Sequence, residues 1–244
     1  MLMILTSITR YPIKGLAGEL LTDVAVKRGE TLPGDRRHAL QFCDRVPPDP
    51  ENWRSKKYFL QSTQSNLCAD IRIQWTTNFV TLSHSNQTLT MSRDLLDGRN
   101  FAEWISRLDP SLGQFTLETL DSGFTDEKEA YVSLLNRSTI KAIAKATGTT
   151  DYPERYRGNL LIEQAKPFQE LQWVGKTLMI GSAQFEVIEP IIRCRATEFD
   201  WHGKRTRGFL NRLNQLCETD VCGIFLHTSS GGLISTGDRI RVTD

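Results

Sequence analysis

Apolar residues occur along this chain mainly in short runs that alternate with polar residues and are bounded by glycine, proline, asparagine or serine. Such runs are typical of β-strands. They predict strands at residues 3–8, 20–26, 38–42, 71–75, 79–84, 88–92, 160–162, 177–180, 185–190, 223–227 and 234–242. Ser85-Asn86-Gln87 separates two of these strands and predicts a β-hairpin, and Thr236-Gly237-Asp238 predicts a turn within the last segment.

Three segments instead place their apolar residues at helical spacing. They are residues 101–108, 139–147 and 206–216. The second helix follows Ser138, a residue type that favours the N-cap, and ends at Gly148, a residue type that favours the C-terminus.

Many short strands and few helices indicate a mixed α/β protein built on a barrel-like sheet, not a helical bundle. The proline-rich segment 45–52 predicts a surface loop. No internal repeat or low-complexity tract divides the chain of 244 residues, which is long enough for one large domain or two small ones.

Composition narrows the possible partners. Thirty Lys+Arg against 29 Asp+Glu give a net charge of +1, so no overall field favours nucleic acid or an anionic membrane, and any anion site must be local. The N-terminus has no basic leader followed by a sustained apolar run, and no stretch reaches the roughly 20 apolar residues that span a bilayer. We therefore expect a cytoplasmic protein, in which thiols stay reduced.

The cysteines do not form a recognisable metal or disulfide pattern. The five cysteines include no Cys-x-x-Cys pair, and the chain has only four histidines. This spacing argues against a zinc site and against a disulfide framework. Because the number of cysteines is odd, at least one of them is available for a chemical role.

Cys194 is the strongest candidate for that role. It follows an apolar strand and lies between Arg193 and Arg195. Neighbouring positive charge favours the thiolate, the form that attacks electrophiles and binds soft metals. The alternative is that Cys194 is a small buried hydrophobic residue, as free cysteines usually are.

Four basic residues lie next to glycine, next to Cys194 or near an expected strand end: Lys14, Arg36, Arg157 and Arg193. Arginine in such places can make bidentate, charge-assisted contacts to a phosphate or another oxyanion. Taken one at a time, each is equally explained as a solvated surface charge or half of an ion pair.

Considered together, the motifs resemble those of the MOSC-domain family with its N-terminal MOSC β-barrel region. The matching blocks occur in family order and span nearly the whole chain. They are residues 8–40 with Tyr-Pro-Ile-Lys and Gly-Asp-Arg, residues 155–162 (RYRGNLLI), Pro167-Phe168 with Trp173 and Gly181, Arg193-Cys194-Arg195-Ala196-Thr197 with Asp200, and residues 222–240.

The resemblance implies a β-barrel-like MOSC core at residues 121–244, preceded by a β-rich, barrel-like region at residues 1–120. By position in the family's motifs, Cys194 would bind molybdenum held by a pterin dithiolene, the molybdenum cofactor (Mo-molybdopterin). Lys14, Arg36, Arg157 and Arg193 would contact the cofactor or its phosphate, and Asn159 would bond the pterin. Asn136 and Ser138, just before a predicted helix, fall near another family contact region, where a helix N-terminus favours an anion.

The activity implied by the amidoxime-reducing members is an oxidoreductase that reduces N-hydroxylated small molecules by two-electron cleavage of the N–O bond. The resemblance does not extend to the fused ferredoxin-like domain of some bacterial relatives, so we expect electrons to come from separate electron-transfer proteins. Nor does it extend to the pyridoxal-phosphate-dependent desulfurase region of a cofactor sulfurase, so we do not expect a complete cofactor sulfurase. The alternative function is a carrier of molybdenum cofactor or of sulfur, the latter as a persulfide on Cys194.

Three positions depart from the family pattern. Gly15 replaces the serine that follows the lysine in many reductases, and Asp200-Trp201 replaces the usual Asp-Pro. Ile191 and Ile192 occupy the neighbourhood of the family's second cysteine. A third possible function, a scaffold that has lost its cofactor, follows from the change at Gly15.

Overall fold

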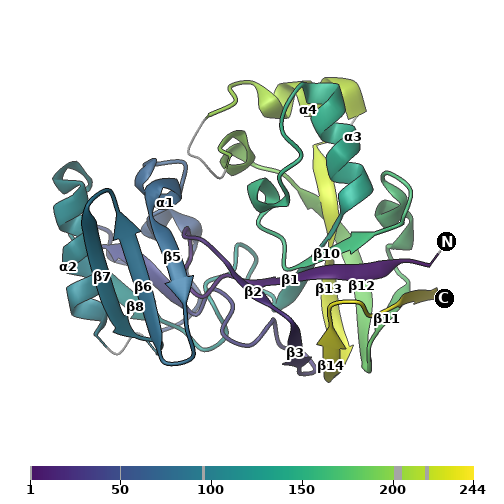
Figure 1. Cartoon of the computed structure of the whole chain (residues 1–244), viewed down its shortest axis with the longest axis horizontal. Coiled ribbons are helices and arrows are strands. Elements are labelled where there is room, and N and C mark those ends of the chain that lie inside the picture. The colour runs from purple at the N-terminus through teal and green to yellow at the C-terminus, as the bar shows by residue number, and fades with distance from the viewer. Residues whose placement is uncertain (1, 50, 95–96, 201–204, 218–219) are drawn as a thin grey trace. The chain divides into compact units, whose positions relative to one another are not determined.

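A computed structural model describes residues 2–49, 51–94, 97–200, 205–217 and 220–244 (Figure 1). The chain divides into two compact units that interleave along the sequence. The first unit contains the N-terminal segment up to Arg10, Leu20–Pro33 and Glu129–Asp244. The second unit contains Tyr11–Glu19 and Gly34–Lys128.

The first unit is built on an eight-stranded sheet with the order β15-β11-β12-β13-β9-β10-β1-β2. Its strands are β1 (Ile4–Arg10), β2 (Glu19–Leu21), β9 (Tyr131–Asn136), β10 (Leu160–Glu163), β11 (Thr177–Ile180), β12 (Ala183–Ile192), β13 (Val221–Ser230) and β15 (Ile240–Thr243). The β9–β10 pair is parallel. The sheet curls back on itself, because Ile4 bridges to Arg239 and the Ile240 N–H donates to the Met3 carbonyl at 2.9 Å.

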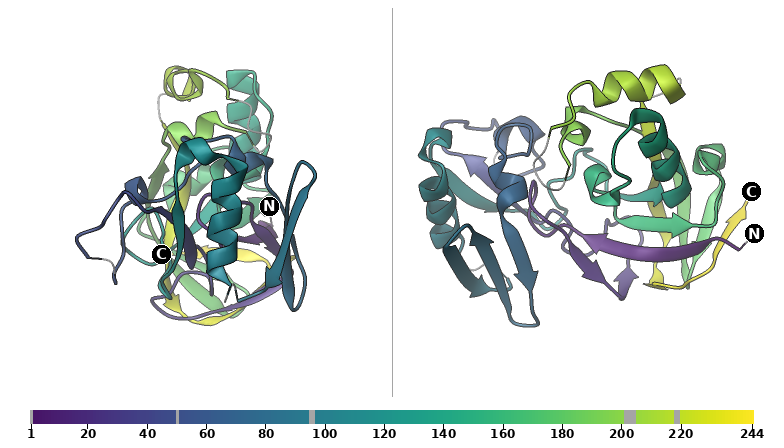
Figure 2. Two further views of the ribbon diagram at one scale, coloured as in Figure 1. Left: turned by 90° about the vertical axis from the view of Figure 1, so that its left-hand side faces the viewer. Right: turned by 45° about the horizontal axis from the view of Figure 1, so that its top comes forward.

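Apolar side chains fill the interior of this curled sheet. The core residues alternate along the strands, as in β12, where Ala183, Phe185 and Val187 are buried and the residues between them are not. A separate pair, β3 (Asp23–Val26) with β14 (Gly232–Ser235), adds Val24, Val26 and Ile234 to the same core. Helices α3 (Arg137–Thr147) and α4 (Phe209–Cys217) pack against each other over one side of the sheet (Figures 1 and 2).

The second unit has two small sheets and two α-helices among its described residues. Strand β4 (His38–Phe42) pairs with β8 (Phe115–Thr119), and β5 (Arg72–Trp75), β6 (Phe79–His84) and β7 (Gln87–Ser92) form a meander. Its helices are α1 (Leu67–Asp70) and α2 (Gly98–Leu108), with 3₁₀ turns η1 (Lys56–Tyr58) and η2 (Pro110–Leu112). One face of α2 packs into the core of this unit through Phe101, Trp104 and Ile105.

The predicted elements are largely confirmed. Strands β4, β6 and β11 have the predicted bounds, and the hairpin of β6 and β7 is present, with His84 paired to Gln87 across the turn. The predicted strand 20–26 is divided into β2 and β3, and the predicted segment 234–242 becomes β14 and β15 on either side of the expected turn. The mixed α/β class with a barrel-like sheet is therefore correct.

Some expectations were wrong or incomplete. The N-cap of α3 is Asn136, whose side chain accepts the Ser138 N–H at 3.0 Å, and not Ser138 itself. Strands β8 and β9 were not predicted. The segment 45–52 contains no helix or strand in its described residues, and Pro50 lies outside them. The division at residue 120 stays a prediction about family domains, whereas the packing units interleave.

The described residues contain no helix that is both long and apolar enough to cross a membrane.

Candidate functional site

Cys194 lies in a tight turn at the end of β12. It is the N-cap of the 3₁₀ turn η5 (Arg195–Glu198), and its thiol is exposed. The Thr197 N–H and hydroxyl both donate to the Cys194 carbonyl, at 3.0 and 2.8 Å. The Cys-x-x-Thr spacing therefore closes the turn and holds the backbone of the cysteine.

Two arginines fix the shape of this turn. Arg155 is buried, and its Nη1 donates to the Thr197 carbonyl at 2.8 Å while its guanidinium lies 5.0 Å from the Phe209 ring centroid. Arg193 donates from Nε to the Cys222 carbonyl at 2.8 Å and from Nη1 to the Tyr156 carbonyl at 2.9 Å. Both side chains bind backbone carbonyls, so they position the segments around Cys194. Burial lowers the pKa of Arg155, and Tyr156 and Asp200 oppose that shift.

The Arg-Gly-Asn segment joins three strands of the first unit. Asn159 is buried, and its Oδ1 accepts from the Ser133 N–H at 3.1 Å and from the Ser133 hydroxyl at 2.8 Å. Its Nδ2 donates to the Thr9 carbonyl at 3.1 Å. A Cβ on Gly158 would come within 2.4 Å of the Leu135 side chain, which explains the glycine. The amide of Asn159 is thus already used within the protein; Arg157 is half-buried and has a left-handed backbone (φ 51°).

The N-terminus of α3 is held by a buried polar network. Asn136 donates from Nδ2 to the Lys166 carbonyl at 2.8 Å and to Oε2 of Glu170 at 2.7 Å. The Thr139 hydroxyl donates to the same oxygen at 2.9 Å. Glu170 is fully buried, and its Oε1 has no hydrogen-bond partner among the described residues. Burial raises the pKa of Glu170, and the hydrogen bonds from Asn136 and Thr139 only partly oppose it.

The second unit contains the other two predicted cations. Lys14 is buried, and its Nζ donates to the Phe124 carbonyl at 2.8 Å and to Oδ1 of Asp126 at 2.6 Å. Arg36 pairs with Asp35 and lies with its guanidinium 5.0 Å from the Tyr11 ring centroid. Burial opposes the charge of Arg36, but Asp35 and Asp126 raise its pKa above the ordinary value.

The residue after Lys14 must be glycine here for a physical reason. Gly15 has a φ of +84°, in the left-handed region, and an added Cβ would lie 2.7 Å from the Leu60 carbonyl oxygen. The departure from the family's serine is therefore a property of this turn.

The seven predicted site residues divide between the two units. Cys194, Arg193, Arg157, Asn159 and Ser138 belong to the first unit, and Lys14 and Arg36 belong to the second. Within each unit the side chains have the contacts given above; the meeting of the two groups around one ligand stays a prediction. Trp201, which replaces a family proline, lies outside the described residues.

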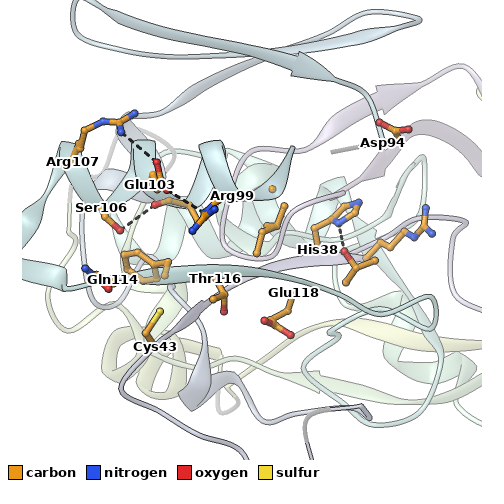
Figure 3. A pocket seen from close by; sticks show the side chains of 16 residues that line it. His38, Cys43, Asp94, Arg99, Glu103, Ser106, Arg107, Gln114, Thr116 and Glu118 are labelled. Atoms are coloured by element: carbon orange, nitrogen blue, oxygen red, sulfur yellow. Dashed lines mark hydrogen bonds and ion pairs between the residues drawn. The ribbon is translucent and has the colours of Figure 1, made fainter. Parts of the chain in front are cut away.

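A separate groove of about 1230 Å³ lies in the second unit between α2 and β8 (Figure 3). Its lining contains His38 from β4 and Glu118 from β8. Glu103 of α2 also lines it and forms ion pairs with Arg99 and Arg107, one turn away on either side. Burial, followed by the charge of Arg37, lowers the pKa of His38 from 6.5 to about 4, so the ring is neutral near pH 7. Positive and negative side chains are mixed in this groove, and none of the seven predicted site residues lines it.

Four residues with a role in these arrangements were not predicted: Arg155, Thr197, Glu170 and Asp126. Arg155 and Thr197 belong to the quoted motifs RYRGNLLI and Arg-Cys-x-x-Thr, so position within a motif was the available signal. Glu170 and Asp126 are acids whose hydrogen-bond partners only the fold reveals. The described residues contain no cluster of three or more His, Cys, Asp or Glu side chains able to bind a metal ion.

Comparison with known proteins identifies the family. Residues 121–241 match the model of the MOSC domain. The chain is 28% identical to the molybdenum cofactor sulfurase of Anopheles gambiae over 134 residues, covering 45% of this chain and 17% of that protein. It is 32% identical to the molybdenum cofactor sulfurase of Drosophila ananassae over 108 residues, covering 40% of this chain and 13% of that protein. The chain thus spans less than a fifth of the length of these curated relatives.

Two solved structures are also similar. The YuaD protein of Bacillus subtilis aligns with a TM-score of 0.49 at 11% identity, over 99% of this chain and 96% of that one. YiiM of Geobacillus stearothermophilus aligns with a TM-score of 0.38 at 14% identity, over 46% of this chain and 54% of that one. On the family match, residues 121–241 of this chain are a MOSC domain.

Proposed function

We propose that this protein binds the molybdenum cofactor with Cys194 as a ligand of the metal and reduces N-hydroxylated small molecules. The observation that carries the proposal is the exposed Cys194 thiol, in a turn that Thr197, Arg155 and Arg193 hold in place. A thiolate is a ligand that soft metal centres prefer, and a rigid support lowers the cost of placing it. The relatives named molybdenum cofactor sulfurase support a role in the chemistry of this cofactor.

The donors of the chain fit such a group in part. Lys14 and Arg36 are cations of the kind that bind phosphate, although each is now paired with a carboxylate. The N-terminus of the 11-residue helix α3 offers backbone N–H groups and a favourable dipole. Arg193 and Asn159 fit less well as cofactor contacts, because their hydrogen bonds already go to Cys222, Tyr156, Ser133 and Thr9. We assign these two residues to positioning the site.

When bound, the cofactor would supply two electrons for the reaction R–NHOH + 2 e⁻ + 2 H⁺ → R–NH₂ + H₂O, and separate electron-transfer proteins would restore them. The chain's own part is to bind and orient. Cys194 anchors the metal at the end of β12, and Arg155 prevents its turn from relaxing.

The exposed thiol also supports a second function, transfer of sulfur as a persulfide on Cys194. A thiol at the surface can attack the outer sulfur of a donor's persulfide and take that sulfur while the donor's thiol leaves, whereas a buried thiol cannot. The persulfide requires no metal, which separates the two functions experimentally.

The test compares the wild type with Cys194→Ala and Cys43→Ser, all purified from a host that makes molybdenum cofactor. Cys43 is the matched control, because it is also an exposed free cysteine but belongs to the second unit. We expect near-stoichiometric molybdenum and pterin, with turnover of a hydroxamic acid or an amidoxime, in the wild type and in Cys43→Ser only. A metal-free wild type with an extra sulfur on Cys194 by mass spectrometry favours the carrier, and a metal-free, unmodified and folded wild type contradicts both functions.

A further inference from the structure

The two cations of the second unit have counter-ions of different character. Asp35, the partner of Arg36, is completely buried, and its Oδ1 also accepts the Tyr11 N–H at 2.7 Å. Asp126, the partner of Lys14, has 55% of its side chain exposed although the Lys14 side chain is only 6% exposed. Asp35 is therefore part of the local fold, and Asp126 is a surface carboxylate that binds a buried ammonium.

The contacts of Asp126 make it the more easily exchanged of the two acids. Among the described residues its side chain makes one hydrogen bond, to Lys14. Lys14 keeps a hydrogen bond to the Phe124 carbonyl that does not depend on Asp126. Moving the carboxylate into solvent would therefore leave the ammonium partly bonded and open to another anion.

Charge balance explains why such an exchange would matter. The two ion pairs, Lys14 with Asp126 and Arg36 with Asp35, carry no net charge between them. Lys56 adds a weaker positive charge near Asp126. An anionic ligand approaching the two pairs gains little until one carboxylate leaves. Only Asp126 can leave without breaking a buried backbone contact.

We propose that Asp126 is the exchangeable counter-ion of Lys14, whose position a phosphate ester takes when the ligand binds. The proposal rests on the proposed function for the identity of the ligand, a phosphorylated pterin, but not for the exchange itself. Asp126 thereby sets the affinity of Lys14 for phosphate and excludes weakly charged groups from it.

The exchange is independent of mild changes in pH. The part of the Asp126 side chain that is shielded from water opposes the ionised form, but Lys14, Arg36 and Lys56 together hold the pKa of Asp126 well below its ordinary range. The carboxylate therefore stays charged between about pH 5 and 8. Competition for Lys14 therefore persists across this interval.

The experiment measures binding of inorganic phosphate to the cofactor-free full chain by calorimetry. Asp126→Asn keeps the size of the side chain and removes its charge. Asp121→Asn is the matched control, because Asp121 is an exposed acid of the same unit that pairs with Arg37. We expect Asp126→Asn to bind phosphate about tenfold more tightly than the wild type, an ordinary coupling between two competing ligands, and Asp121→Asn to bind as the wild type does. Adding Lys14→Gln to Asp126→Asn should abolish the gain.

Equal or weaker phosphate binding by a folded Asp126→Asn would overturn the proposal and make Asp126 a fixed partner of Lys14. If that variant fails to fold, carbodiimide labelling of carboxylates in the wild type tests whether Asp126 leaves Lys14 when an anion binds. Saturating inorganic sulfate should raise the labelling of Asp126 and leave Asp121 unchanged; an unchanged Asp126 contradicts the exchange. A gain in phosphate affinity in a protein that never carries molybdenum supports the exchange and refutes the proposed function, and molybdenum without such a gain does the reverse.

Discussion

The basic residues of the two units have different hydrogen-bond partners, although they look alike in the sequence. In the first unit, Arg155 and Arg193 donate to backbone carbonyls around Cys194. In the second unit, Lys14 and Arg36 face the carboxylates of Asp126 and Asp35. A cation bonded to carbonyls keeps its charge and fixes a shape, whereas a cation paired with a carboxylate has its charge cancelled until that partner leaves.

This difference shows that the arginines and lysines of a family motif do not all have the same role. Those beside Cys194 set the geometry of the turn that carries it, and those near Gly15 and Asp35 form the proposed anion site. The predictions below test this division, beginning with the largest expected effect.

Arg155→Ala should have the largest effect on stability. The change removes a charge-assisted hydrogen bond to the Thr197 carbonyl and the packing over Phe209, at a cost of about 3 kcal/mol in the free energy of unfolding. Urea unfolding measures it, with Arg157→Ala as the control from the same segment. An unchanged stability together with weaker phosphate binding would show that Arg155 binds anions and would break the division.

Acid should destabilise the second unit through His38. The folded pKa of about 4 lies below the ordinary 6.5, so the folded state disfavours the proton. Its contribution is present above pH 6.5 and is lost as the pH falls towards 4, with a total on the order of 3 kcal/mol. Unfolding measured from pH 7 to 4 should show this loss in the wild type and in the control His84→Gln, but much less of it in His38→Gln. Equal slopes in all three would assign the acid sensitivity to another group.

Gly15→Ser, which restores the residue common in the family, should destabilise the second unit by about 2 kcal/mol or more. The left-handed backbone and the 2.7 Å approach to the Leu60 carbonyl both oppose a side chain. Thermal unfolding measures the loss, and Gly113→Ser is the control, since Gly113 also has a positive φ but has open space at its Cβ. If the two variants lose the same stability, the approach to Leu60 contributes nothing.

Glu170 should make the stability of the first unit depend on pH in the opposite direction. Burial raises its pKa, so the folded state favours the protonated form and the wild type loses stability as the pH rises through that pKa. Glu170→Gln stays neutral and should become more stable than the wild type at pH 8, by about 1 kcal/mol. Chemical unfolding at pH 5 and pH 8 measures the difference, and a gap that does not widen with pH contradicts it.

The sequence predicted most of the fold because local patterns determined it. Alternation of apolar and polar residues revealed β6 and β7, and Gly148 marked the end of α3, where it adopts the left-handed conformation. Strand β9 was missed because residues 132–136 are all buried, so alternation was absent. The cap of α3 was placed at Ser138 because both serine and asparagine favour that position, and only the geometry chooses Asn136.

The candidate site could be predicted only as far as the motifs reached. The exposure of Cys194 agrees with its predicted chemical role. The internal bonds of Asn159 and the pairing of Lys14 with Asp126 join residues 26 and 112 positions apart, which no local pattern records. The partners of a polar side chain depend on which segments the fold brings together, and that information lies outside any single motif.

The most direct test of the account is X-ray absorption at the molybdenum edge, on the wild type, Cys194→Ser and Cys43→Ser. The account predicts molybdenum in the wild type and in Cys43→Ser with the same number of sulfur ligands. It predicts one sulfur ligand fewer in Cys194→Ser, or loss of the metal from that variant. Molybdenum bound in all three proteins with identical sulfur coordination would contradict Cys194 as its ligand.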